Sequence, residues 1–186
     1  SLDVAWPSSW ALPAMSEWLD ASDLAWQRVD EGAAEWTWQR TDQDLGPEGY
    51  VLDVSQDKVT VTCADEEAAF RAWTTLRQLM PPVCEQGCPT GFTLPAVRVE
   101  DHANLAHRGL LLDCCRHFME PEFVKTVIDV LALQKMNVLH WHLTEDQGWR
   151  LPIEAYPQLT EVGGYRTEAD GTVTGGAYTR EEILDI

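Results

Sequence analysis

The sequence predicts an α/β protein whose two halves are built differently. In the first half, residues 50–55 and 58–63 alternate apolar and polar side chains with period two, which is typical of an antiparallel β-hairpin. In the second half, apolar runs at 108–114 and 138–143 enclose a helical pattern. A strand, a helix and a strand of these lengths form a βαβ unit with parallel strands. The predicted class is therefore a small α+β domain followed by parallel βα units.

The first half supplies a helix as well as the hairpin. Asp65 is a suitable N-cap for the helix that follows, which must stop before Pro81. The apolar residues of this helix share one face, namely Ala69, Phe70, Trp73, Leu76 and Met80. That face can cover one side of a sheet. Earlier in the chain, residues 13–26 are compatible with a helix and residues 35–40 alternate like a strand.

The second half begins at residues 108–114, a nearly continuous apolar run of the kind that is buried on both faces of a sheet. Pro121 favours the start of a helix, and Lys135 falls in its expected last turn. After the second strand, residues 165–178 resemble a hairpin, and residues 179–182 match the capping box of a further helix.

A proline-bounded segment at residues 93–109 separates the halves, so we place the domains at 1–104 and 105–186. Two strands and one complete helix cannot close a barrel or make a wide sheet. The apolar faces of the second domain therefore need further partners. We expect the sequence to be cut short within that domain.

Charge and composition exclude several functions. The 31 acidic and 13 basic residues give a net charge of -18, which repels phosphate backbones and anionic lipids, so we expect no nucleic acid partner. No apolar stretch approaches the roughly 20 residues that span a bilayer, and no secretory signal is visible after Ser1. We predict no cofactor. The sequence leaves the oligomeric state open.

The five cysteines are too few for a disulfide scaffold. Cys84 and Cys88 flank three residues of a loop, where a disulfide and two free thiols are both compatible with the spacing. Cys114 and Cys115 end an apolar strand and are expected to be packing residues, because no second pair at zinc-finger spacing exists. The acidic balance and the Cys84–Cys88 pair favour a secreted, periplasmic or lysosomal-type setting.

Polar residues gather where the two predicted parallel strands end, which is where α/β proteins bind ligands. They are Asp113, Arg116 and His117 after the first strand, and His142, Glu145, Asp146, Trp149 and Arg150 in and after the second. An arginine beside a carboxylate suits a ligand with vicinal hydroxyls, because the guanidinium donates in a fixed fork and the carboxylate accepts. Arg116 and Glu145 could equally form a structural ion pair.

Other interpretations of this region stay open. His140 and His142 are two residues apart on one strand, so their side chains share a face and could bind a metal in a metal-dependent hydrolase. A layer of hydrogen-bonded histidines is the commoner arrangement. Trp141 points to the opposite face and is expected to pack. Glu145 and Asp146 are adjacent, but adjacency alone does not place two carboxylates on either side of a scissile bond.

Taken together, the motifs resemble a known family. "RGLLLD" at 108–113, "NVLHWHLTEDQGWR" at 137–150 and "YPQLTEVGGYR" at 156–166 are similar to the start of the catalytic barrel of family 20 glycoside hydrolases, the β-N-acetylhexosaminidases. Residues 50–81 resemble the non-catalytic α+β domain that precedes this barrel. The resemblance covers residues 45–186.

This resemblance implies a (β/α)8 TIM barrel and removal of terminal β-linked N-acetylglucosamine or N-acetylgalactosamine from chitin, other oligosaccharides or glycoconjugates. Such enzymes are retaining without an enzymic nucleophile, because the 2-acetamido oxygen of the substrate attacks the anomeric carbon. An adjacent aspartate and glutamate on a later strand orient that group and act as acid and base. Their Gly-Gly-Asp-Glu-like motif is absent here, so we expect the chain alone to be inactive.

The resemblance also implies roles for single residues. Arg116 matches the arginine that binds the 3- and 4-hydroxyls of the terminal sugar. Glu145 stands where many members have aspartate, a position linked through a later histidine to the acid/base glutamate. Asp146 is expected to support the loop. The alternatives are a non-catalytic carbohydrate-binding or interaction module, and the metal-dependent hydrolase that would use the two histidines.

Overall fold

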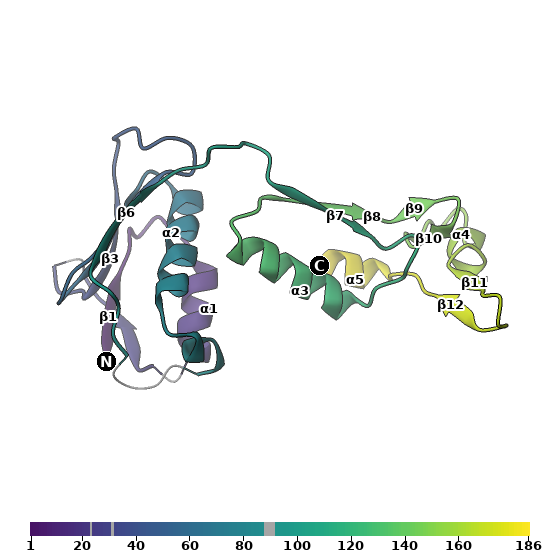
Figure 1. The fold of residues 1–186 in the computed structure, drawn as a ribbon, viewed down its shortest axis with the longest axis horizontal. Coiled ribbons are helices and arrows are strands. Elements are labelled where there is room, and N and C mark those ends of the chain that lie inside the picture. The colour runs from purple at the N-terminus through teal and green to yellow at the C-terminus, as the bar shows by residue number, and fades with distance from the viewer. Residues whose placement is uncertain (23, 31, 88–91) are drawn as a thin grey trace. The chain divides into compact units, whose positions relative to one another are not determined.

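The computed structural model describes residues 1–22, 24–30, 32–87 and 92–186. They form two compact units, Ser1–Ala106 and His107–Ile186, whose helices and strands are shown in Figure 1. Among the described residues, no helix has the length and apolar character needed to cross a bilayer.

The first unit is built on a six-stranded mixed sheet with the strand order β2-β1-β3-β5-β4-β6. Its strands are β1 (Leu2–Ala5), β2 (Trp26–Arg28), β3 (Trp36–Arg40), β4 (Tyr50–Val54), β5 (Val59–Cys63) and β6 (Val97–Asp101). β1 is parallel to β2 and β3, and β3 is parallel to β5. β4 is antiparallel to both β5 and β6, so the predicted hairpin is confirmed.

Two helices, α1 (Pro13–Ala21) and α2 (Glu66–Leu79), cover one face of this sheet (Figure 1). α2 begins where the sequence predicts, because the Asp65 side chain accepts a hydrogen bond of 2.9 Å from the backbone N–H of Ala68. N–H groups in the first turn have no partner within the helix, so this cap stabilises its start.

The segments before the hairpin were predicted in part. The expected strand at 35–40 is β3, whereas α1 is shorter than the predicted 13–26, because Trp26 joins the sheet in β2. Cys84 is buried in a short 3-10 helix, η1 (Pro82–Gln86). Cys88 lies outside the described residues, so a disulfide with Cys84 and two free thiols both stay open.

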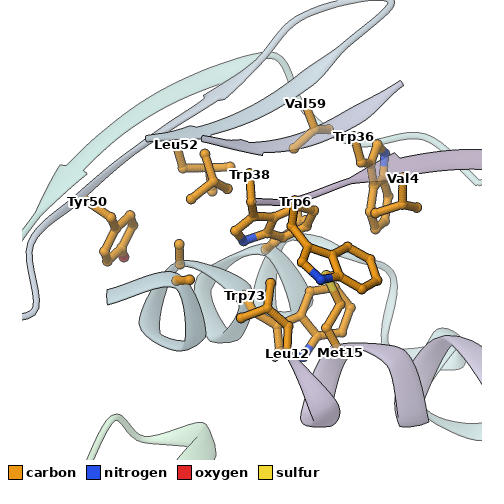
Figure 2. Packing of buried hydrophobic residues seen from close by; sticks show 14 of the residues in the cluster. Val4, Trp6, Leu12, Met15, Trp36, Trp38, Tyr50, Leu52, Val59 and Trp73 are labelled. Carbon is orange, nitrogen blue, oxygen red and sulfur yellow. The ribbon is translucent and has the colours of Figure 1, made fainter. Parts of the chain in front are cut away.

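Tryptophans dominate the core between the sheet and its helices (Figure 2). Trp38 on β3 and Trp73 on α2 are 0% and 2% exposed, with ring centroids 6.4 Å apart. Trp36 lies 6.5 Å from both rings, and Trp18 on α1 meets Trp73 edge to face at 5.3 Å. Such large rings contribute much of the apolar burial of a core. The cluster therefore ties β3 to both helices.

The second unit contains the predicted βαβ unit. β7 (Gly109–Asp113) and β8 (Val138–His142) pair in parallel, and α3 (Pro121–Leu133) connects them, starting at Pro121 as predicted. The remaining elements are β9 (Thr144–Glu145), β10 (Gly148–Trp149), α4 (Gln158–Glu161), β11 (Tyr165–Thr167), β12 (Val173–Gly175) and α5 (Arg180–Asp185). The β11–β12 hairpin and the capping box of α5 are confirmed.

Two details of the second half were predicted wrongly. Lys135 is not in the last turn of α3, which ends at Leu133; it takes a left-handed φ of 55° as the chain leaves the helix toward β8. β7 is not buried on both faces, since Leu110 and Leu111 are 40% and 53% exposed. Among the described residues β7 pairs with β8 alone, which leaves part of the strand uncovered.

The packing roles predicted for the cysteines and for Trp141 are confirmed. Cys114 and Cys115 are 0% exposed. Trp141 packs edge to face on the buried Tyr178, with ring centroids 4.8 Å apart, and its Nε1 donates to Cys114 Sγ at 3.3 Å. Cys114 and Tyr178, with Leu112 and Val124, form the small core of the second unit, and Trp141 packs against it.

Trp38→Ala should lower the stability of the first unit by about 3–5 kcal/mol, because it removes a fully buried ring from the tryptophan cluster. The Trp38 indole N–H has no hydrogen-bond partner among the described residues, so the loss is one of packing. Urea unfolding followed by far-UV circular dichroism measures it. Arg40→Ala, at the exposed end of the same strand, is the control and should change stability by less than about 0.5 kcal/mol. Equal stability of the two variants would contradict this account.

Candidate functional site

The parallel pairing of β7 and β8 brings the polar residues of both strand ends together. Asp113 lies opposite His142 in the register. Asp113 Oδ1 is 3.6 Å from His142 Nδ1, and His142 Nε2 is 3.5 Å from Glu145 Oε2. The imidazole therefore lies between two carboxylates. The prediction that these residues share one rim is confirmed.

Arg116 joins them from the turn after β7. Its Nη1 donates to Asp113 Oδ2 at 2.7 Å, and its Nε forms an ion pair with Glu145 Oε1. The Arg116 side chain is 43% exposed, and its Nη2 makes no hydrogen bond to the described residues. The guanidinium therefore keeps donors for a ligand while two carboxylates hold it. We call Asp113, Arg116, His142 and Glu145 the strand-end cluster.

Asp113 fixes the turn that carries Arg116. Its Oδ1 accepts hydrogen bonds of 3.1 Å from the backbone N–H groups of Cys115 and Arg116. Desolvation acts to raise the pKa of Asp113, but the hydrogen bonds from the Arg116 side chain and backbone outweigh it and hold this pKa below its ordinary value. Glu145 Oε1 is buried and has no partner of hydrogen-bond geometry among the described residues. Its contact with Arg116 is therefore an ion pair, which agrees with both the structural and the ligand-binding interpretation of these two residues.

Arg150 was predicted at the rim, and the structure corrects this, because Arg150 is only 3% exposed. Its guanidinium donates to four backbone carbonyls, those of Cys114, Cys115, Gly164 and Gly176. These bonds satisfy the buried donors and so permit the burial. The paired glycines at 163–164 and 175–176 were the sequence feature that could have indicated this buried arginine, since glycine allows backbones to approach closely.

A surface hollow of about 680 Å³ lies beside Glu145 and has two aromatic side chains in its lining, Trp149 and Tyr156. Trp149 is half-buried and donates its Nε1 to the carbonyl of Leu151 at 2.7 Å, whereas Tyr156 is 66% exposed. Asp146 also lines the hollow and is exposed. The sequence predicted Trp149 and Asp146 at the strand-end rim but did not indicate Tyr156, which lies in an irregular segment.

The side chains fit a metal ion poorly. Ligand atoms of Asp113, Cys115 and His142 lie within 4.8 Å of one another. Both oxygens of Asp113 already accept hydrogen bonds, one from the Arg116 guanidinium, which would also repel a cation. Burial raises the pKa of Cys115 to about 11, so its thiolate is scarce at neutral pH. His140 is outside this group, so the pairing of His140 with His142 as metal ligands gains no support from the described residues.

His117 does not join the strand-end cluster through any contact that the described residues show. It is exposed on the turn after Arg116. Arg166 of β11 does reach the turn, since its Nη1 donates to the carbonyl of Arg116 at 2.8 Å. Sequence reasoning missed Arg166, because its approach depends on how the β11–β12 hairpin folds back.

Arg116→Ala should raise the pKa of Asp113, because the hydrogen bonds and charge that lower it are largely those of Arg116. In the folded wild type this pKa lies below the ordinary 3.8, so the ionised form contributes stability above that pH and loses it as the pH falls further. Carboxyl 13C chemical shifts recorded between pH 2 and 6 measure the change. Arg98→Ala, which removes an ion pair with Asp53 in the first unit, is the control. An Asp113 titration that is identical in both variants would contradict the proposed cause.

Comparison with known proteins identifies the family. Residues 14–102 match the family described as glycosyl hydrolase family 20, domain 2, and residues 105–186 match glycosyl hydrolase family 20, catalytic domain. A beta-hexosaminidase of Porphyromonas gingivalis is 44% identical over 144 residues, which are 76% of this chain and 18% of that protein. A beta-N-acetylhexosaminidase of Cellulomonas fimi is 40% identical over 149 residues, which are 79% of this chain and 29% of that protein.

Solved structures agree. A mutant Streptomyces plicatus beta-hexosaminidase in complex with the product N-acetylglucosamine is 32% identical with a TM-score of 0.86, covering 100% of this chain and 38% of that one. The family 20 exo-β-N-acetylglucosaminidase of Vibrio harveyi, also in complex with N-acetylglucosamine, is 27% identical with a TM-score of 0.81, covering 100% of this chain and 30% of that one. The chain thus spans well under half the length of these relatives. Because both domain matches and these relatives agree, the chain belongs to glycosyl hydrolase family 20, a family of hydrolases, and carries its domain 2 followed by the start of its catalytic domain.

Proposed function

We propose that the complete protein removes terminal β-linked N-acetylhexosamine residues from oligosaccharides or glycoconjugates, and that this chain supplies part of the terminal-sugar site. Support comes from the family and from relatives named beta-hexosaminidase. Two solved relatives hold N-acetylglucosamine. In this proposal residues 1–104 form a non-catalytic domain, and residues 105–186 form the first βα units of a (β/α)8 barrel.

The observation that carries the proposal is the partly exposed guanidinium of Arg116. Asp113 and Glu145 hold it on two sides, and its Nη2 remains for a ligand. A guanidinium donates to neighbouring hydroxyls, and carboxylates beside it accept from them. We propose that Arg116 binds the 3- and 4-hydroxyls of the terminal sugar. Barrel enzymes place their sites at the carboxyl ends of strands, where this cluster lies.

The proposed chemistry uses groups beyond the strand-end cluster. The 2-acetamido oxygen of the substrate attacks the anomeric carbon while the glycosidic oxygen leaves with a proton, and water then opens the oxazolinium ion with net retention. An adjacent aspartate and glutamate orient the acetamido group and move the proton, and residues 1–186 contain no such pair after two glycines. In this scheme Arg116 binds the sugar, and Glu145 is a positioning residue that acts on the acid/base glutamate through a histidine of a later strand, not through His142.

Arg116→Ala in the full-length protein should raise KM for a chromogenic β-N-acetylglucosaminide, by roughly 10- to 100-fold for each charged hydrogen bond lost. The effect on kcat should be smaller, because the arginine is remote from the bond that breaks. Steady-state kinetics measure both constants.

The matched control is Lys125→Ala, since Lys125 pairs with Glu122 and Asp185 on α3 and α5, away from the cluster. Its KM should equal that of the wild type. Unchanged kinetics in Arg116→Ala would remove Arg116 from the sugar site.

Residues 1–186 on their own should release no aglycone from the same substrate, because the proposed acid/base pair is not among them. An assay of the purified chain over hours, with the full-length protein as the positive control, tests this. Measurable turnover by residues 1–186 would overturn the assignment of the acid/base groups. Binding of N-acetylglucosamine by a monomeric, cooperatively folding chain would favour the carbohydrate-binding alternative.

A further inference from the structure

The buried guanidinium of Arg150 has an unusual set of partners. Nε donates to the carbonyl of Cys114 at 2.9 Å, and Nη2 donates to that of Cys115 at 2.7 Å. Nη1 donates to the carbonyls of Gly164 and Gly176, the latter at 2.8 Å. No carboxylate among the described residues pairs with it. A buried charge without a counter-charge is costly, so this arginine depends on all its carbonyl partners.

These carbonyls belong to the segments beside Arg116 and Glu145, which we call the sugar clamp. Cys114 and Cys115 lie between β7 and Arg116, on the turn that aims the Arg116 side chain. Gly164 and Gly176 are at the base of the β11–β12 hairpin, where the backbone N–H of Gly176 also donates to the carbonyl of Gly164 at 2.9 Å. Arg150 therefore fastens the turn to the hairpin.

Arg150 is itself held against the second strand of the site. Its backbone N–H donates to the carbonyl of Leu143 at 2.9 Å, just after β8, and its carbonyl accepts from Tyr178 N at 3.0 Å. A Cβ at Gly148 would overlap the carbonyl oxygen of Cys115. The guanidinium of Arg150, and the glycine that lets it approach, thus hold the Arg116 turn beside the end of β8, together with the hydrogen bond of 3.1 Å from the Cys114 N–H to the carbonyl of His142.

We infer that Arg150 is a positioning residue for the sugar clamp, which sets where Arg116 stands relative to Glu145 and thereby the discrimination at the 4-hydroxyl of the terminal sugar. This inference rests on the proposed function of Arg116. Arg150 does not touch the sugar, because its guanidinium is buried and all four of its bonds go to the backbone. N-acetylglucosamine and N-acetylgalactosamine differ only at that hydroxyl. A small displacement of Arg116 therefore affects the two sugars unequally.

The test compares Arg150→Ala and Arg150→Lys in the full-length protein with chromogenic N-acetylglucosaminide and N-acetylgalactosaminide. KM should rise about tenfold, and this change should exceed the fall in kcat. The reason is that a displacement of about 1 Å in a group that holds the substrate lowers the efficiency of an enzyme by up to about 100-fold. The ratio of kcat/KM for the two sugars should move by at least about threefold. Arg180→Ala, an exposed arginine that starts α5, should leave the ratio unchanged.

Chemical rescue separates positioning from a general loss of folding. In Arg150→Ala, added methylguanidinium should bring KM and the ratio of kcat/KM for the two sugars part of the way back to the wild-type values, because it can donate to the same carbonyls. Methylammonium should not, because it lacks the planar fork. Circular dichroism and active-site titration give the folded fraction of each variant.

The outcomes are distinct. The inference is overturned if kcat/KM falls equally for both sugars and in proportion to the folded fraction. It is also overturned if both variants fail to fold, because Arg150 then serves the fold alone. If Arg116→Ala leaves KM unchanged for both sugars, the proposed function itself fails. If Arg116→Ala changes KM while the Arg150 variants keep the wild-type ratio, only the present inference fails.

Discussion

The parallel pairing of β7 with β8 is the constraint on which the candidate site depends. The register sets Asp113 opposite His142, and the partners of Arg116 then come from both strand ends. A slip of one residue would turn each side chain of a strand to the other face and separate the charged groups. The helix between the strands enforces the pairing, since Val124 of α3 is 0% exposed in the same small core as Leu112. The packing of α3 against the strands therefore also sets the geometry of the site.

The two arginines of this site meet opposite electrostatic requirements. Arg116 is partly exposed and faces two carboxylates, which compensate its charge and leave part of its fork to solvent. Arg150 is buried and surrounded by carbonyl dipoles, which satisfy its donors without bringing a second charge out of water. Carboxylates thus accompany the arginine that is partly exposed, and carbonyls the arginine that is buried.

Local patterns predicted much of the fold, because each depends on residues close in sequence. The hairpin of β4 and β5, the Asp65 cap and the start of α3 at Pro121 are of this kind. The shared rim of Asp113 and Glu145 was also predictable, since parallel strands end at the same edge. The burial of Arg150 was not, because its partners lie far away along the chain. Nor was the exposure of Leu111, which depends on how many strands flank β7.

The tryptophan core of the first unit determines what an optical measurement on this chain reports. Seven of the nine tryptophans precede residue 107, so the intrinsic fluorescence comes mainly from the first unit. In the second unit Trp141 lies in the small core, where its Nε1 donates to Cys114 Sγ at 3.3 Å. Trp149 lines the hollow beside Glu145, at the candidate site. In a variant that keeps Trp149 as its single tryptophan, a change in emission would report changes near the strand ends, which the emission of the first unit otherwise masks.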